Sequence, residues 1–387
     1  MGDDEWDYIG SPVAGQNLQT LIDNNSSLAT GGAGNSQVAI GVFDNGAGAD
    51  TAAAMYTNYS TTGNSGVTIT SGQGFVMATD DGSTTATVDF TGTVNTSNVT
   101  FAIDDETSSN TNYGKFNLVA NPFPSYLAFN TAAVSASSAT EAFLTVNATS
   151  NDNLHNSYAG LWGYDGDGSF TEYNSTSAGA IYIAPGQGFF VAADANANLS
   201  FTEAMQTTTG GDDFNTTDDV LNDTHEVLLR LYHGEEMIED ARLYFEEGLS
   251  LGLDVSYDMG DFNYNSPLMT RLVEEDEGYG MAINAMSTDH MDDVVIPLVI
   301  NQDAGQEFRV NLHTSTIGEV NIYLEDTELS TLTLLNEQDF VLTPTSNLSD
   351  VGRFYIHLTA DTLSNGDVNT SLLNAYKEVD TNYITIE

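Results

Sequence analysis

The chain has 387 residues, of which 56 are acidic and 7 are basic, so its formal net charge is −49 at pH 7. Such a surface lacks the cations that neutralise phosphates, and it repels nucleic acid and anionic lipid headgroups. The absence of cysteine excludes disulfides, thiolate metal sites and cysteine nucleophiles. No run approaches the roughly 18 apolar residues of a membrane-spanning helix. We therefore expect no nucleic-acid partner and no transmembrane segment.

The first half of the chain contains a duplication. Residues 6–12 (WDYIGSP) are matched by residues 116–122 (FNLVANP), at an offset of 110 (116 − 6). Residues 71–76 (SGQGFV) are matched by residues 185–190 (PGQGFF), at an offset of 114 (185 − 71). Two motifs in the same order at nearly the same offset indicate a duplicated unit of about 100 residues, the size of a small domain. We therefore expect two related β repeats, which we name repeat one (residues 1–105) and repeat two (residues 106–206).

Short apolar runs, rich in β-branched and aromatic residues, dominate both repeats. Gly, Asn, Asp or Ser closes each run, and a new run begins about every ten residues, as in a β-sandwich or jelly roll. Helical periodicity is rare. The predicted strands include residues 38–43, 66–70, 86–90 and 180–183, and the predicted helices cover residues 17–23 and 131–137.

A polar segment rich in Gly, Thr and Asp, residues 207–219, reads as a linker after the repeats. Beyond it Glu becomes common, and long strand patterns predict a separate β-sandwich over residues 220–362. A polar tail, residues 363–387, ends in another strand-like run. The expected fold is therefore all-β, with two tandem sandwich- or jelly-roll-like units followed by a further β-sandwich. The strands predicted in that sandwich are residues 226–232, 241–245, 294–300, 308–313, 320–325 and 353–358.

Four motifs carry a resemblance to a known family. Residues 116–126 (FNLVANPFPSY) resemble the NLVGNPYPS motif of large secreted surface proteins of the Bacteroidetes, with Ala120 where that family usually has Gly. Residues 185–191 (PGQGFFV) resemble the strand that follows it there. The YLED motif at 323–326, with GRFYI at 352–356, resembles the sandwich that precedes a type IX secretion sorting domain. The tail resembles the first strands of that sorting domain, and we expect it to be the start of a sorting domain whose remainder is missing.

The resemblance implies export by the type IX secretion machinery, then attachment to the outer cell surface or release from it. It implies no catalytic residues, because the matching motifs are structural in that family. The dense acidic surface is also compatible with a saline setting, since salt screens the repulsion between copies of the chain. An acidic secreted protein of ordinary stability is an equally good interpretation.

One acidic loop imitates the start of a calcium-binding loop. Asp165, Asp167 and Ser169 place oxygen atoms at the first, third and fifth positions of such a loop. The twelfth position is Thr176 rather than Glu, and the residues that follow are strand-like. The alternative is a simple acidic hairpin turn. Calcium is thus the one candidate cofactor, and both interpretations stay open.

Aromatic residues gather in the same predicted hairpin. Trp162 and Tyr164 share strand parity, so they face the same side of the sheet, and Phe170 and Tyr173 follow across the turn. These four residues form a candidate platform for a glycan ligand. The alternative is a packing role, in the core or between the two repeats.

Motifs for catalysis are weak. The Gly-Gln-Gly motifs are followed by strand residues rather than by a helix, so they are not phosphate loops, and glycine is expected there for a positive φ or a bulge. His225-Glu226 lacks the second histidine that a zinc protease needs. We therefore expect a non-enzymatic extracellular cell-surface protein, an adhesin or a structural, self-assembling module. Its expected partners are its own copies or other cell-surface proteins. The alternative is a carbohydrate-binding accessory region of a larger secreted enzyme, with a polysaccharide as partner.

Overall fold

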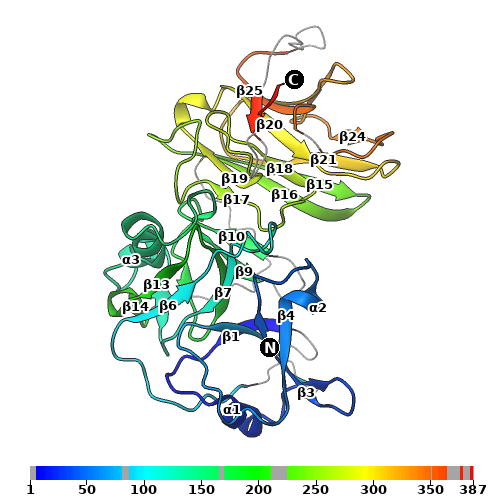
Figure 1. The fold of residues 1–387 in the computed structure, drawn as a ribbon. Coiled ribbons are helices and arrows are strands. Elements are labelled where there is room, and N and C mark those ends of the chain that lie inside the picture. Colours follow the sequence, from blue (N-terminus) through cyan, green and yellow to red (C-terminus); the bar gives the residue numbers. More distant parts are fainter. Residues whose placement is uncertain are drawn as a thin grey trace. The chain divides into compact units, whose positions relative to one another are not determined.

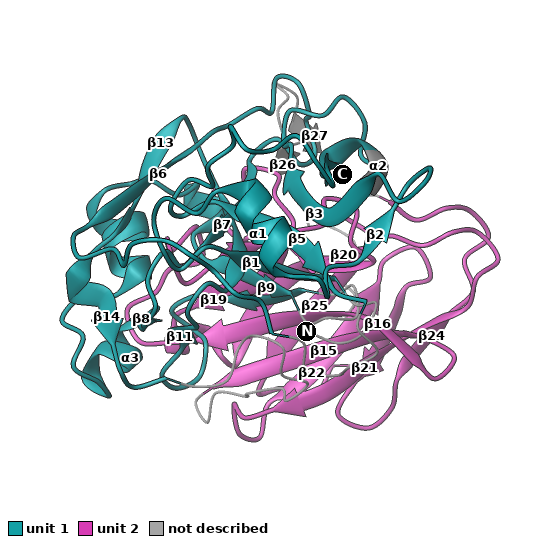
Figure 2. Cartoon of the chain, turned by 90° about the horizontal axis from the view of Figure 1, so that it is seen from below, with its two compact units in different colours: residues 1–219 teal, residues 220–387 magenta. Residues whose placement is uncertain are grey.

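The computed structural model describes residues 6–80, 87–164, 170–210, 225–349 and 351–363, and the backbone of two short strands, β26 (Ala375–Lys377) and β27 (Ile384–Ile386). The fold is all-β, as predicted. The chain divides into two compact units, residues 1–219 and 220–387 (Figures 1 and 2). Both sequence repeats lie in the first unit, and most of the predicted linker falls outside the described residues.

The two repeats fold into sheets with the same strand order. In repeat one the order is β1-β5-β3, with β4 paired to the far side of β3 and the short β2 added beside it. In repeat two the order is β7-β12-β9-β10. The strands of repeat one are β1 (Trp6–Gly10), β2 (Thr30–Gly31), β3 (Gln37–Phe43), β4 (Tyr56–Ser60) and β5 (Gly74–Ala78). Those of repeat two are β7 (Phe116–Ala120), β9 (Leu161–Tyr164), β10 (Phe170–Tyr173) and β12 (Gly188–Ala192).

The strand registers show which positions are equivalent in the two repeats. Gly10 pairs with Gly74 in repeat one, and Ala120 pairs with Gly188 in repeat two. Farther along, Gly41 on β3 pairs with Val76, whereas Trp162 on β9 pairs with Phe190. Because Val76 and Phe190 are related by the same offset of 114 (190 − 76), Trp162 occupies the strand position of Gly41.

Reciprocal backbone contacts join the two repeats. The amide of Gly10 donates to the carbonyl of Gly186 (2.8 Å), and the amide of Ala120 donates to the carbonyl of Gly72 (2.9 Å). Each contact is the equivalent of the other under the offsets of the duplication. Gly72 and Gly186 have φ angles of +91° and +70°, which confirms the predicted role of these glycines. The two repeats therefore form one compact unit, in which equivalent backbone hydrogen bonds hold each repeat to the other.

Smaller sheets and short helices complete the first unit. β6 (Val99–Ile103) pairs with β13 (Ala197–Phe201), and β8 (Tyr126–Ala128) pairs with both β11 (Tyr182–Ile183) and β14 (Gln206–Thr207). The predicted helices are confirmed as α1 (Leu18–Asn24) and α3 (Thr131–Ser135); α2 (Ala52–Met55) was not predicted. Asn17 and Asn130 cap α1 and α3 by accepting from the backbone amides of Thr20 and Ala133.

Two strand predictions in repeat one are not matched by strands. Within residues 66–70 only Thr68 makes a bridge, to Asn17, and residues 87–90 have no strand assignment. At residues 89 and 91, side-chain amides accept the hydrogen bonds of the backbone amides in place of a partner strand. The side chain of Asn25 accepts from the amide of Asp89 (2.7 Å), and that of Gln16 accepts from the amide of Thr91 (2.5 Å).

The second unit is built on one eleven-stranded sheet that curls around a single core. Alternate residues of its long strands, such as Val227, Leu229 and Leu231, are fully buried in one cluster with residues from both halves of the sheet. The halves thus face each other as in a sandwich. The strands are β15 (Glu226–His233), β16 (Glu236–Phe245), β17 (Met259–Gly260), β18 (Leu268–Thr270), β19 (Met281–Met286), β20 (Asp293–Ile300), β21 (Phe308–Ser315), β22 (Asn321–Asp326), β23 (Thr331–Leu334), β24 (Phe340–Leu342) and β25 (Phe354–Thr359). In the part of the chain that the structure describes, no helix has the length and apolar character needed to cross a membrane.

Candidate binding groove

The predicted calcium loop, with Asp165, Asp167 and Ser169, lies outside the described residues. The equivalent turn of repeat one is closed by its own hydrogen bonds. There, the carboxylate of Asp44 accepts from the amide of Gly46 (3.0 Å), as in a tight acidic turn. Among the described residues, no three His, Asp or Glu side chains gather as a metal site would require.

The structure places the four residues of the predicted glycan platform in different surroundings. Trp162 is fully buried (0% exposed), and its ring packs edge-on against Phe116, with centroids 5.1 Å apart. The face of its ring is therefore not presented to solvent. Tyr164, Phe170 and Tyr173 are half-buried. Tyr164 and Phe170 pair across the hairpin, with ring centroids 5.5 Å apart.

An aromatic cluster fills the space between the two repeats. Tyr8 of repeat one lies 4.8 Å from Tyr164 and 5.4 Å from Phe190, centroid to centroid. Phe43 lies 4.9 Å from Phe190, and the hydroxyls of Tyr8 and Tyr56 are 2.8 Å apart. Burial raises the pKa of Tyr8 to about 12 and also raises that of Tyr56, so both phenols stay neutral. Tyr164 and Phe170 thus serve the contact between the repeats.

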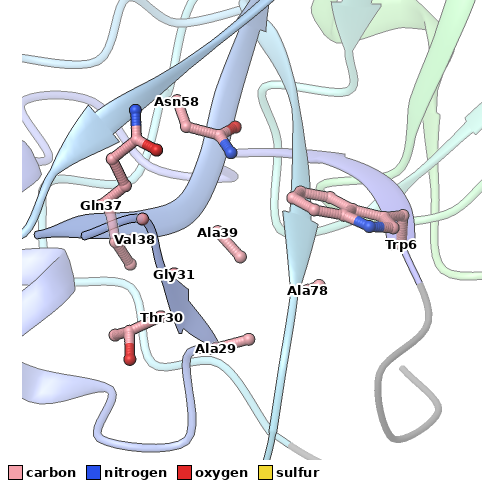
Figure 3. A pocket seen from close by; sticks show the side chains of 10 residues that line it. Trp6, Ala29, Thr30, Gly31, Gln37, Val38, Ala39, Asn58 and Ala78 are labelled. Atoms are coloured by element: carbon pink, nitrogen blue, oxygen red, sulfur yellow. The ribbon is translucent and has the colours of Figure 1, made fainter. Parts of the chain in front are cut away.

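On the same face of the repeat-one sheet, beyond this cluster, lies an open groove of about 260 Å³. Trp6, at the start of β1, forms one wall and is 40% exposed (Figure 3). The sequence analysis did not select Trp6 as a site residue. The signal that could have found it is its place in the duplication, where Trp6 is the equivalent of Phe116 in repeat two. The lining residues are Trp6, Ala29, Thr30, Gly31, Gly32, Gln37, Val38, Ala39, Asn58 and Ala78.

Two side-chain amides lie at this groove. Gln37 comes from β3 and Asn58 from the neighbouring β4, and both line the groove together with Trp6 (Figure 3). Neither amide makes a hydrogen bond to another described residue. The groove therefore combines an exposed indole with donors and acceptors that are available to a ligand.

The corresponding face of repeat two is filled. Phe116 stands in the position of Trp6 and Trp162 in that of Gly41, and both are buried. Tyr158 completes the filling, with its ring 5.8 Å from Phe116 and 6.1 Å from Trp162. Repeat one therefore has a groove where repeat two has a packed aromatic core.

A second groove, of about 130 Å³, lies at the join between the repeats. It is lined by residues of β1, by Tyr164 and by residues 184–188 of the Gly-Gln-Gly motif. Its lining includes Ile9 and Gln187, which form a β-bridge between the repeats, so we take the larger groove as the better candidate for a ligand.

Buried carboxyl groups form the other unusual feature, in the second unit. Burial raises the pKa of Asp258 to about 7, although its carboxylate accepts from the amides of Ala285 (2.7 Å) and Asp254 (2.6 Å). Burial also raises the pKa values of Glu239 and Asp261, and the neighbouring charges of Asp240 and Glu239, respectively, raise them further. None of the three lines either groove. We assign them to the pH dependence of stability.

The chain matches, over residues 1–358, the family described as a domain of unknown function, DUF8693. It belongs to this family. The match runs through both compact units, so the two repeats and the eleven-stranded sheet are parts of the same family region. No curated protein and no solved structure matches the chain.

Proposed function

We propose that the chain is a non-enzymatic extracellular surface protein, an adhesin or structural module exported by type IX secretion. The support is that residues of the motifs that resemble Bacteroidetes surface proteins are used to hold the fold. The Asn121 side chain donates to the carbonyls of Ser125 (2.8 Å) and Ile183 (3.1 Å). Gln187 accepts from the amide of Ala184 (2.8 Å). Motifs of this kind build a scaffold on which surfaces are presented.

The partners proposed for this scaffold are copies of the chain or other cell-surface proteins. The net charge of −49 keeps copies apart at low salt, and screening at higher salt permits contact. Calcium is part of the same proposal through the acidic loop at residues 165–169, since a divalent cation can bridge carboxylates of neighbouring copies.

The Trp6 groove favours a second function, that of a carbohydrate-binding accessory region of a larger secreted enzyme. Ligand sites combine an apolar or aromatic wall with a few convergent polar groups. Trp6 supplies the aromatic wall, and Gln37 and Asn58 supply the polar groups. An adhesin that recognises glycans would use the same groove, so the two functions share one site.

Localisation tests the main proposal. Antibodies raised against the purified chain are applied to intact and to permeabilised cells of the source organism, and to cells that lack the type IX translocon. We expect labelling of intact cells or recovery from the medium, and loss of both without the translocon. A periplasmic protein serves as the control for cell integrity. Labelling that requires permeabilisation in every strain would reject surface export.

A further inference from the structure

We propose that the groove of repeat one binds one neutral sugar ring, in the place that the Trp162 side chain takes in repeat two. The inference rests on the proposed glycan-binding function and names its ligand and its site. The duplication supplies an internal reference: equivalent strands, in the same register, carry an aromatic filling in one repeat and an open groove in the other.

Gly41 is not itself a lining residue of the groove, but it lies next to Asn58, which is. Its φ is not among the positive values, so the backbone does not require glycine there. A Cβ atom built on Gly41 would meet the side-chain oxygen of Asn58 at 2.5 Å, and the next atom, the carbonyl oxygen of Thr57, at 3.5 Å. The end of the Asn58 side chain can turn away, so a larger residue fits once it moves. Glycine at this position therefore places no side chain beside Asn58, whereas the equivalent position of repeat two carries Trp162.

The residues that line the groove indicate the chemical class of its ligand. The exposed indole of Trp6 offers an apolar face to the C–H face of a sugar ring. The Gln37 and Asn58 amides offer donors and acceptors to ring hydroxyls. An aromatic side chain in the groove would leave those amides without partners, which costs free energy when water is excluded.

The volume of the groove and the negative charge of the chain favour a ligand of one uncharged sugar ring. The groove of about 260 Å³ is smaller than the 300–1,000 Å³ or so of sites for drug-sized ligands. None of its ten lining residues is Lys, Arg or His, and the chain carries a net charge of −49. Uronic acids and sulfated sugars would enter a negative field without a cation to bind them.

Tryptophan emission can report on the groove alone. The chain has two tryptophans, Trp6 and Trp162, so the variant Trp162→Phe leaves Trp6 as the single reporter. This variant is titrated with a panel of neutral monosaccharides up to tens of millimolar, with the corresponding uronic acids as charged probes. We expect a saturable change of Trp6 emission for at least one neutral sugar. The uronic acid with the same ring should bind at least about tenfold more weakly.

Calorimetry on the otherwise unchanged chain then locates the site. Gly41→Trp should place an indole against Asn58 and into the side of the groove, and Asn58→Ala should remove one polar contact, so both should weaken binding, the first by about tenfold or more. Gly66→Trp is the matched control, because a Cβ on Gly66 meets no atom within 4 Å. Retained circular dichroism shows that each variant is folded.

Three results would overturn the inference. In the first, no neutral sugar changes the emission of Trp6 or gives heat. In the second, a sugar binds equally well to the chain and to both Gly41→Trp and Asn58→Ala. In the third, Gly41→Trp abolishes self-association in light scattering, which would assign the groove to a second copy. Surface labelling of cells does not depend on these results, so each proposal can fail alone.

Discussion

Arg353 donates two hydrogen bonds to the carboxylate of Asp326, from Nε to Oδ1 (3.0 Å) and from Nη2 to Oδ2 (2.7 Å). Asp326 is 0% exposed and also accepts from the backbone amides of Glu328 and Leu329. The guanidinium lies 4.9 Å from the ring centroid of Phe354. The two residues come from the YLED and RF motifs, so these motifs meet in one buried ion pair between β22 and the start of β25.

Replacing Arg353 with Met should destabilise the second unit strongly. The change leaves the Asp326 carboxylate buried without its counter-charge, and such losses cost about 3–5 kcal/mol. Urea unfolding followed by far-UV circular dichroism measures the loss. Tryptophan emission should keep its midpoint, since both tryptophans lie in the first unit.

The pair between Arg309 and Asp339 provides the matched control. Its Nη1–Oδ2 distance is also 2.7 Å, but both side chains are about 30% exposed. Arg309→Met should therefore cost about 1 kcal/mol or less. Equal losses for the two variants would show that burial of Asp326 does not set the strength of its ion pair.

Stability of the second unit should fall as the pH rises from 5 to 8. Burial raises the pKa of Asp258 from 3.8 to about 7, and those of Glu239 and Asp261 also rise. Between about pH 4 and pH 7 the folded state therefore holds protons that the unfolded state has released. Each step up in pH then favours unfolding. Urea midpoints by circular dichroism at several pH values measure the slope.

Glu239→Gln should make this slope shallower and raise the free energy of unfolding at pH 8. The amide stays neutral and no longer repels the Asp261 carboxylate, while its oxygen can still accept from Ser266. Glu236→Gln, at an exposed position of the same strand, is the control and should leave the slope close to that of the parent. An unchanged slope in Glu239→Gln would show that Glu239 does not contribute to the pH dependence of stability.

The join between the repeats should not tolerate a methyl group at Gly188. A Cβ atom there would stand 2.6 Å from the carbonyl carbon of Tyr8 and 2.8 Å from the amide nitrogen of Ile9. Backbone cannot turn away as a side chain does, so Gly188→Ala should cost about 1–3 kcal/mol or more. Tryptophan emission during urea unfolding follows the first unit. Gly66→Ala, in open space, should leave the midpoint nearly unchanged, and similar midpoints for both variants would contradict the close approach.

Much of this fold could be predicted from local patterns. The repeated motifs at offsets of 110 and 114 correctly indicated two equivalent sets of strands, and Asn17 and Asn130 marked helix starts that the structure confirms. The reciprocal contacts of Gly10 and Ala120 with the other repeat could not be predicted. They depend on how two sheets meet, and strand periodicity carries no information on that.

The candidate site could likewise be predicted only in part. The alternation of side chains along a strand placed Trp162 and Tyr164 on one face of the sheet, but it could not tell which part of that face another segment covers. Burial of Trp162 depends on Phe116 and Tyr158, whose approach is a tertiary event. Comparison of the two repeats at Gly41 would have shown the missing ring, but the offset there is 121 (162 − 41), so the match appears only once the strands are paired.

Higher salt should promote association of the chain if it is an assembling surface protein. The repulsion that follows from a charge of −49 is long-ranged at low salt and is screened within about 3–10 Å between 1 M and 0.1 M salt. Light scattering and negative-stain microscopy at low salt and at about 0.5 M NaCl should show larger particles at the higher concentration. The same measurement with millimolar calcium, and with magnesium as the control, tests the acidic loop at residues 165–169. A monodisperse monomer in all arms would reject self-assembly by this chain.

The two tryptophans should differ sharply in their access to solvent. Trp6 is 40% exposed on the rim of the groove, whereas Trp162 is 0% exposed inside the aromatic filling of repeat two. Acrylamide is the suitable quencher because it is uncharged, whereas iodide would be repelled by the acidic chain. Trp162→Phe, which reports Trp6, should show a red-shifted emission and a quenching constant several-fold larger than Trp6→Phe, which reports Trp162. Equal quenching would mean that Trp6 is covered in solution, and the groove would then be closed to a ligand.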